Sequence, residues 1–324
     1  MDAAMNRRRA AMALGLLLTG LGSAAQNWPT KTVKVVAPFA AGSAVDIVAR
    51  TVSEQLATQL GQSFVVENRT GAAGTIATGL VAKADADGYT LLATSSAHTL
   101  APLLHANLSY DPARDFAAVT PLGTTPFVLV VSPSKGFKTA REFVTAANAR
   151  PGEFNFASVG EGSASHLSAV RFRLSAGVQA VHVPFKGGPE AMTEVIAGRI
   201  DFFFVAMGAA LPQIQGGKLT ALAVNGARRS PALPAVPTTR EAGFDNAEYP
   251  TWFGLFVPAR TPRDIVDRLH RETLAALQEP KVRDKLAALG IEPMSMSSSE
   301  FDAFVEMEIA VNAALLKAIG WKPK

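Results

Sequence analysis

Three loops hold the residues best suited to bind an anion, and the first spans residues 39–46. It follows a run typical of a buried strand and opens a helical pattern. Free backbone N–H groups and the positive end of a helix dipole meet at such a point, which suits a carboxylate. An ordinary strand-to-helix turn, with Asp46 as a capping carboxylate, fits the same residues. The candidate ligand-binding residues in this loop are Phe39, Ala41, Gly42, Ser43 and Asp46.

The second loop, residues 158–166, has the same plan. Two glycines free its backbone, and Ser163 or Ser165 can cap the following helix and donate a hydrogen bond. If the two loops belong to different lobes, two helix N-termini face each other across a cleft. Such a pair suits a monocarboxylate or a dicarboxylate without an arginine. The candidate ligand-binding residues here are Gly160, Gly162, Ser163, Ala164 and Ser165.

The third loop, residues 94–98, places hydroxyl groups beyond the end of another expected strand. Ligands of open α/β sheets bind at the carboxyl ends of the strands. Ser95, Ser96 and His98 therefore join the candidate ligand-binding residues.

Catalytic and cofactor-dependent chemistry has little support in the sequence. Ser163 and His166 could act as nucleophile and base, but no G-x-S-x-G motif is present and a structural role for His166 is favoured. The five histidines lack metal-ligand spacing, and no Walker or dinucleotide-binding motif occurs. The absence of cysteine excludes disulfides, zinc thiolates and iron–sulfur clusters. We expect no catalytic residue, no metal and no cofactor.

The elements that position these loops alternate between short β-rich runs and helical patterns. Many of the runs are almost continuously apolar, as expected for strands covered on both faces. The alternation predicts an α/β protein with mostly parallel sheets. Capping boxes predict helix starts at Ser43, Thr139, Thr261 and Ser299. The expected strands are 33–36, 64–67, 89–93, 127–131, 154–157, 180–183, 201–205, 221–224 and 253–257.

The N-terminus has the pattern of a secretory signal. Arg7, Arg8 and Arg9 precede an uncharged apolar stretch, and small residues follow at 22–25. The apolar stretch is shorter than the about 20 residues that a membrane anchor needs. We expect a signal peptide at residues 1–25 and export. Because three arginines and one aspartate precede the cleavage, the net charge falls from +4 to +2, and no later basic run suits nucleic acid.

Segments rich in proline and glycine at 121–126 and 231–250 divide the rest of the chain. We interpret them as two crossings between α/β lobes, with the last strand returning to the first lobe. The expected boundaries are 26–125 for the first part of lobe 1, 126–250 for lobe 2, and 251–324 for the return segment and C-terminal helices of lobe 1. A chain of 324 residues is long enough for two such lobes.

Short motifs in a fixed order give the chain a resemblance to a known family. They are VVAPFA at 35–40, DIVAR at 46–50, VVENR at 65–69, DGYTLL at 87–92, YDP at 110–112, DF at 115–116, HVPFKG at 182–187, SPALP at 230–234, VPT at 236–238 and EAG at 241–243. From residue 28 to about 318 the chain resembles the substrate-binding proteins of tripartite tricarboxylate transporters, also called Bug receptors. The resemblance implies a two-lobed periplasmic-binding-protein fold (Venus flytrap, type II-like) in the periplasm.

The resemblance also implies further ligand contacts. It adds Phe185, Lys186 and Gly187, with Phe39 and Phe185 covering the apolar part of the ligand. Many relatives carry aspartate where this chain has Val205. If Val205 lines the pocket, the missing carboxylate argues against an amino-acid ligand; repacking outside the pocket is the other interpretation.

The function implied is that of a receptor without catalysis. It would bind a small mono- or dicarboxylate, aromatic acids included, and deliver it as a monomer to a tripartite tricarboxylate-type membrane permease. Two alternatives stay open. One is an exported hydrolase that uses Ser163 and His166, and the other is a ligand sensor that partners a membrane kinase.

Overall fold

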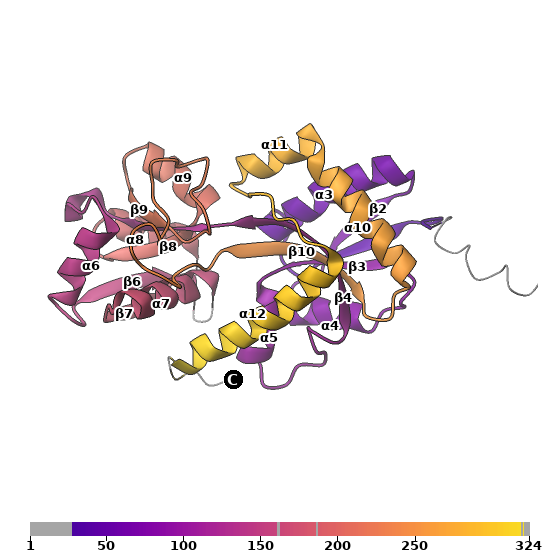
Figure 1. Cartoon of the computed structure of the whole chain (residues 1–324), viewed down its shortest axis with the longest axis horizontal. Coiled ribbons are helices and arrows are strands. Elements are labelled where there is room, and N and C mark those ends of the chain that lie inside the picture. Colours follow the sequence, from indigo (N-terminus) through magenta and orange to yellow (C-terminus); the bar gives the residue numbers. More distant parts are fainter. Residues whose placement is uncertain (1–27, 161–162, 186, 319, 321–324) are drawn as a thin grey trace, which may run out of the picture.

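The chain folds into two lobes joined by two extended crossings (Figure 1). The computed structural model describes residues 28–160, 163–185, 187–318 and 320, so the expected signal peptide lies outside the described residues. Each lobe holds a five-stranded sheet, ordered β2-β1-β3-β10-β4 in lobe 1 and β7-β6-β8-β5-β9 in lobe 2. The predicted two-lobed α/β fold is confirmed.

Lobe 1 takes its elements from both ends of the chain. Helices α3, α10 and α11 cover one face of its sheet, burying Val48, Leu269 and Leu286, and α4 and α12 cover the other. Its elements are β1 (Val33–Ala37), α3 (Ala44–Leu60), β2 (Phe64–Asn68), the 3-10 turn Ala72–Gly74, α4 (Thr75–Ala82), β3 (Thr90–Ser95), α5 (Ala97–Leu104), β4 (Phe116–Thr125), β10 (Thr251–Pro258), α10 (Arg263–Gln278), α11 (Pro280–Ala288) and α12 (Ser298–Ala318).

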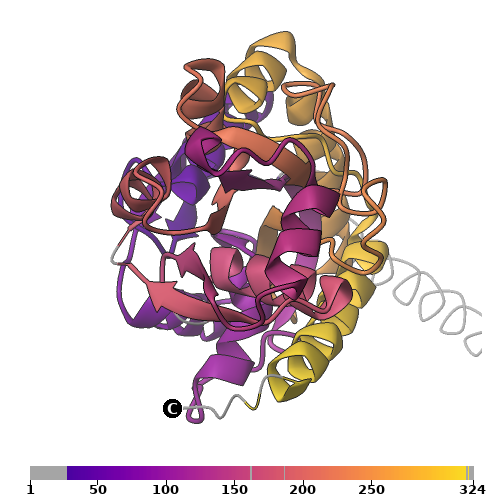
Figure 2. The same cartoon turned by 90° about the vertical axis from the view of Figure 1, so that its left-hand side faces the viewer.

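Lobe 2 comes from the middle of the chain. Helices α6 and α7 pack on one face of its sheet and α8 and α9 on the other (Figure 2). Side chains of β8 alternate between the faces, so Phe202 and Phe204 lie in one core and Phe203 and Val205 in the other. Its elements are β5 (Phe127–Val131), the 3-10 turn Pro133–Lys135, α6 (Ala140–Asn148), β6 (Phe154–Ser158), α7 (Ala164–Ala176), β7 (Ala180–Pro184), α8 (Gly188–Ile196), β8 (Phe202–Ala206), α9 (Met207–Gln215) and β9 (Thr220–Val224).

The strands that follow the crossings set the direction of pairing. Strand β1 pairs in parallel with β2 and β3, and β6 pairs in parallel with β7 and β8. The antiparallel pairs that the structure describes all include β5 or β10. Each of these strands enters its lobe from the junction and therefore runs against the strands beside it.

The segment 121–126, interpreted as a crossing, is mostly strand rather than loop. Strand β4 continues to Thr125, and its ladder with β10 shifts register where Gly254 pairs with Pro121. A proline cannot donate to the ladder, so it is found at edge strands and irregularities. Strand β4 is an edge strand of its sheet, which accommodates Pro121 there.

Two of the four predicted helix caps are confirmed. Ser43 and Thr139 each accept a hydrogen bond from the backbone N–H three residues on, at 3.3 and 3.2 Å. Thr261 instead donates to a backbone carbonyl at 2.7 Å, and Ser297 rather than Ser299 caps α12. These two predictions are wrong for different reasons: the Thr261 hydroxyl is used by the Pro258 carbonyl and α10 begins after Pro262 without a side-chain cap, while Ser297 takes the place expected for Ser299.

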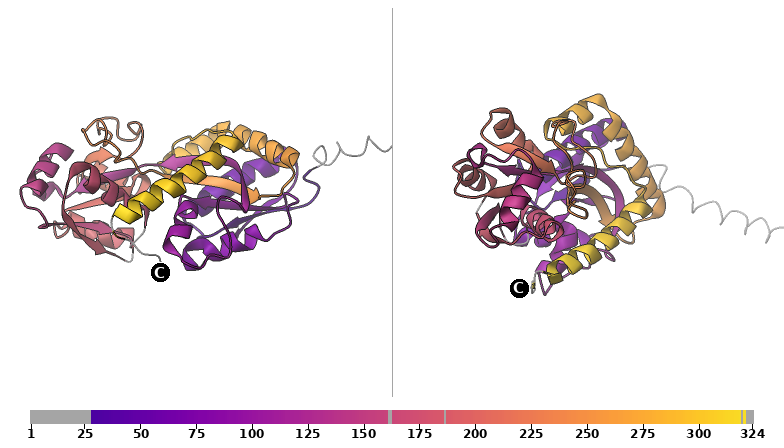
Figure 3. Two further views of the ribbon diagram at one scale, coloured as in Figure 1. Left: turned by 60° about the horizontal axis from the view of Figure 1, so that its bottom comes forward. Right: turned by 60° about the vertical axis from the view of Figure 1, so that its left-hand side comes forward.

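Helix α12 lies across the junction of the lobes (Figure 3). Phe301 packs in the core of lobe 1, while Leu315 and Leu316 share a cluster with Leu167 of α7. This one helix therefore contacts both lobes. None of the described helices, the 21-residue α12 included, has the length and hydropathy to span a membrane.

Asn225 joins the two crossings to each other. Its side chain is fully buried, and its Oδ1 accepts a hydrogen bond from the Phe127 N–H at 2.6 Å. Its Nδ2 donates to the Tyr249 carbonyl at 2.9 Å and to the Ser168 hydroxyl at 3.0 Å. One amide side chain thus holds β5, the segment before β10, and α7 in register.

We predict that Asn225→Ala lowers the free energy of unfolding by about 3 kcal/mol, because it leaves buried polar groups unpaired. Urea unfolding followed by circular dichroism measures the loss. Asn148→Ala is the matched control, since the exposed Asn148 side chain makes one 3.2 Å hydrogen bond to a carbonyl. Equal effects of the two substitutions would contradict the role of Asn225.

Candidate ligand-binding site

A cavity of about 390 Å³ lies between the lobes, and we call it the interlobe cavity. Its wall combines strand ends and helix starts of both lobes. The lining residues are Phe39, Ser95, Ser96, Ala97, Leu100, Ala101, Leu104, His105, Val159, Ser163, Ala164 and Thr251. No lysine or arginine occurs among these described residues, and the N-termini of α5 and α7 contribute positive potential to the wall.

The Asp46 side chain stabilises the first loop, residues 39–46. Its carboxylate accepts a hydrogen bond from the Gly42 N–H at 2.9 Å and pairs with Arg50 at 3.0 Å. Asn68 donates to Asp46 at 2.8 Å and to the Phe39 carbonyl at 2.9 Å. The N–H of Gly42 is therefore occupied within the loop, and Gly42 serves the turn through its φ of +81°.

The same contacts keep Asp46 ionised. Burial would raise the pKa of Asp46, but the hydrogen bonds from Gly42, Arg50 and Asn68 hold it below its ordinary value. The Asp46 carboxylate binds Gly42, Arg50 and Asn68 and does not accept from the first residues of α3. The N–H groups of Ala44 and Val45 have no hydrogen-bond partner in the described part of the chain. These two groups are the free donors at the start of α3.

The second loop is closed by the Ser163 hydroxyl. It accepts a hydrogen bond from the His166 N–H at 3.3 Å, as N-cap of α7, and donates to the Gly160 carbonyl at 2.6 Å. The N–H of Ala164 has no partner among the described residues. Gly162 lies outside the described residues. Helix α7 therefore brings a free donor from lobe 2.

Ser96 adds a free hydroxyl to the wall. Its N–H donates to the Trp252 carbonyl at 3.1 Å, while its Oγ makes no hydrogen bond within the described chain. The residue is buried and lines the interlobe cavity. Buried hydroxyl groups normally find a partner, and a ligand oxygen would supply one here.

The structure brings part of the predicted set together. Five predicted residues line the interlobe cavity: Phe39, Ser95, Ser96, Ser163 and Ala164. Six more lie in the same two loops without lining it: Ala41, Gly42, Ser43, Asp46, Gly160 and Ser165. Phe185 packs against the core of lobe 2, and Gly187 is the N-cap of α8. Lys186, like Gly162, lies outside the described residues.

His98 and Val205 belong to the packing instead. The His98 ring is buried, with Nε2 3.1 Å from the Pro112 carbonyl and ring centres 5.0 and 4.9 Å from Phe116 and Phe256. Val205 lies in the lobe 2 core because strand alternation puts it on the same face as Phe203. Neither side chain lines the interlobe cavity. This corrects our inclusion of His98 and Val205 among the candidate ligand-binding residues. For Val205 it favours the interpretation as repacking outside the pocket.

Several lining residues were missed from the sequence. Leu100, Ala101 and Leu104 form one face of α5, and their i, i+4 spacing predicts an apolar face without indicating what it meets. Thr251 opens β10, and no local motif marks it. The wall thus offers hydrocarbon contacts beside its hydrogen-bond donors.

The donors and the apolar face together suit an organic acid. Free N–H groups at helix starts bind oxyanions, and the α5 face can cover a hydrocarbon body. Among the described residues no cluster of three or more histidine, aspartate or glutamate side chains is placed to hold a metal ion.

Comparison with known proteins gives consistent matches along the chain. A family model described as the tripartite tricarboxylate transporter family receptor matches residues 48–321. BugT of Bordetella pertussis is 33% identical over 326 residues, which cover 99% of this chain and 100% of BugT. A Pseudomonas protein from the tcbD–tcbE intergenic region is 36% identical over 292 residues, or 89% of this chain and 87% of its own.

Solved structures agree. A Rhodopseudomonas palustris protein solved with adipate is 34% identical with a TM-score of 0.78, and the match covers 92% of this chain and 100% of that one. MatC of Rhodopseudomonas palustris, solved with malate, is 33% identical with a TM-score of 0.73, and covers 89% and 100%.

We predict a pH-dependent stability that originates at His98. Burial lowers the pKa of His98 to about 4, against the opposing effect of its hydrogen bond to Pro112. From pH 6.5 down to 4 the unfolded histidine binds a proton that the folded one does not. The free energy of unfolding is therefore unaffected by the protonation of His98 above pH 6.5. As the pH falls below 6.5 it decreases, by up to about 1.4 kcal/mol per pH unit.

Urea unfolding of wild type and His98→Gln between pH 7 and 4.5 measures this slope. The difference between the two proteins is the quantity of interest, because burial raises the pKa of Glu308 to about 6 and gives the opposite slope in both. His105→Gln, at a partly exposed histidine, is the control. Parallel curves for wild type and His98→Gln would contradict the prediction.

Proposed function

The chain belongs to the tripartite tricarboxylate transporter receptor family, and on that premise we propose that it binds a small organic carboxylate in the interlobe cavity. The observation that carries the proposal is that helix starts of both lobes line the interlobe cavity, α5 at Ser96 and α7 at Ala164. The Ala164 N–H and the Ser96 hydroxyl have no hydrogen-bond partner in the described chain. Ala44 and Val45 add two unpaired N–H groups at the end of the loop whose Phe39 lines the cavity.

The proposed ligand carries an apolar body between or beside its carboxylates. Leu100, Leu104 and Phe39 face it, and no lysine or arginine side chain lines the described wall. Binding then depends on fixed backbone dipoles rather than on a mobile cation, which favours carboxylates over larger polyanions. Adipate, the ligand of one solved relative, is an acid of this kind, and malate, the ligand of the other, is a shorter and more polar dicarboxylate.

Binding would draw the lobes together. Because residues at helix starts of both lobes line the cavity, a bound acid adds contacts in the closed arrangement that the open one lacks. The crossings held by Asn225 are the segments about which the lobes would move. We further propose a periplasmic monomer that delivers its ligand to a tripartite tricarboxylate-type permease; a membrane kinase as the partner would leave the binding step the same.

The hydrolase alternative has less support. The Ser163 hydroxyl already donates to the Gly160 carbonyl, and it meets His166 through the backbone N–H. The His166 ring stacks on that of His182, with centres 4.2 Å apart. A serine nucleophile needs its proton aimed at a base, and here the proton points to a carbonyl. We therefore propose binding without catalysis.

We predict that a carboxylate panel containing adipate, malate, hexanoate and benzoate yields at least one ligand by thermal shift. A ligand at 100 times its Kd stabilises the folded protein by about 2.7 kcal/mol. Ser96→Ala weakens that ligand by about tenfold, because one hydrogen bond to a charged group is lost.

Ser63→Ala is the matched control, since Ser63 is an exposed serine of lobe 1 outside the cavity. It leaves both stability and affinity unchanged. A panel without a hit, or equal affinities of the Ser96→Ala and wild-type proteins, would count against the proposed site.

We also predict that the purified protein does not turn over p-nitrophenyl esters of these acids. The measurement is product release by wild type and Ser163→Ala at equal concentration. Turnover by wild type that Ser163→Ala abolishes would establish the hydrolase instead.

A further inference from the structure

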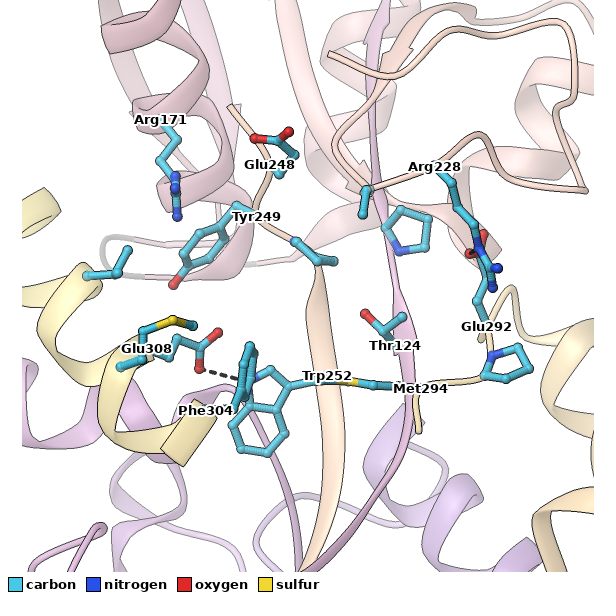
Figure 4. Close-up of a pocket in the computed structure, with 17 residues that line it drawn as sticks. Thr124, Arg171, Arg228, Glu248, Tyr249, Trp252, Glu292, Met294, Phe304 and Glu308 are labelled. Atoms are coloured by element: carbon cyan, nitrogen blue, oxygen red, sulfur yellow. Dashed lines mark hydrogen bonds and ion pairs between the residues drawn. The ribbon is translucent and has the colours of Figure 1, made fainter. Parts of the chain in front are cut away.

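A second cavity, of about 800 Å³, lies on the other side of the junction, and we call it the hinge cavity (Figure 4). Lobe 2 contributes Arg171 and Tyr249 to its wall, and lobe 1 contributes Trp252, Phe304 and Glu308. The receptor function proposed above does not use it. Its size is within the range of small-molecule sites.

The two cavities lie on opposite faces of one strand. Thr251 of β10 lines the interlobe cavity, while its neighbours Pro250 and Trp252 line the hinge cavity. Successive side chains of a strand point to opposite faces, which explains the division. The hinge cavity is therefore a separate site and not an extension of the first.

The hinge cavity has an aromatic and thioether wall. The rings of Trp252 and Phe304 stand at 75° to each other with centres 6.3 Å apart. Met294 and Met307 complete this wall. Aromatic faces attract organic cations, and methionine adapts to apolar groups of different shape.

Two carboxylates, Glu292 and Glu308, line the hinge cavity together with these aromatic and thioether side chains. Glu308 accepts a hydrogen bond from the Trp252 Nε1 at 2.7 Å through one oxygen, and Figure 4 shows its other oxygen directed toward the cavity. Glu292 also lines the cavity, and its Oε1 is buried without a hydrogen-bond partner in the described structure. Its other oxygen lies 3.6 Å from the mostly exposed Arg228, which makes a loose ion pair.

The two arginines of the wall offset part of this negative charge: Arg228 pairs loosely with Glu292, and Arg171 acts on Glu308 through its charge. Arg171 donates through Nε to the Asn246 carbonyl at 3.1 Å and lies over the Tyr249 ring. Arg228 has 69% of its side chain exposed. The cavity thus presents acceptors that lack donors, beside aromatic faces, and its three glutamates outnumber its two arginines.

We propose that the hinge cavity is a second ligand site, for a small organic cation that carries an apolar or aromatic body. The ammonium group donates to the free oxygen of Glu308 and faces Glu292. The hydrocarbon part lies against Trp252 and Phe304.

The test is isothermal titration of the full protein with phenethylammonium chloride at pH 8, where Glu308 is ionised because burial raises its pKa only to about 6. We expect one site with a Kd below about 1 mM, in line with the efficiency of small ligands. The neutral phenethyl alcohol has the same aromatic and ethyl groups, and tests whether the positive charge is required for binding at the hinge cavity.

Glu308→Gln keeps the shape of the side chain and weakens phenethylammonium by about tenfold, since a charge-assisted hydrogen bond becomes a neutral one. Glu306→Gln, on the same helix and lining a different cavity, leaves the affinity unchanged. Glu292→Gln is the second variant if Glu308→Gln does not fold, and also weakens binding. The proposal is overturned by no binding at about 10 mM, a concentration that any useful site of this size would saturate. Affinity unaffected by both substitutions, or equal binding of phenethyl alcohol, overturns it too.

Discussion

The helix starts that line the interlobe cavity, α5 in lobe 1 and α7 in lobe 2, are the constraint on which the proposed site depends. A helix start that faces a cavity needs water or a ligand to satisfy its donors. The loops use their own polar side chains for stability: Asp46 binds the Gly42 N–H, and Ser163 caps α7. The backbone N–H groups that these side chains leave unpaired are suited to bind an oxyanion.

The junction must hold these donors in place and still permit movement. Asn225 joins the crossings through three hydrogen bonds of one buried amide, which fix the crossings relative to each other. Helix α12 adds a polar link through Glu308, which accepts from Trp252 and from the Thr99 hydroxyl at 2.6 Å. Ser96 in turn donates its N–H to the Trp252 carbonyl. The two cavities therefore share a framework of hydrogen bonds around β10.

Local patterns in the sequence predict what is local in the structure. The strands at 127–131 and the helix capped by Thr139 follow from apolar runs and a capping box, and both are present. Loop positions after strands also led to Ser96 and Ser163 in the cavity. The side-chain direction of His98 and Val205 depends on which face packs on the core, and sequence spacing alone does not fix it. Thr251 and the α5 face reach the cavity through the return of the chain to lobe 1, a long-range event without a local signal.

The most direct test of the account is an ¹⁵N–¹H NMR titration of the labelled protein with the carboxylate that gives the largest thermal shift. The account predicts that the amide signals of Ala44, Val45 and Ala164 move most, and downfield, because their N–H groups gain a charged acceptor. Unchanged signals at these three residues, with shifts confined to other parts of the chain, would contradict it.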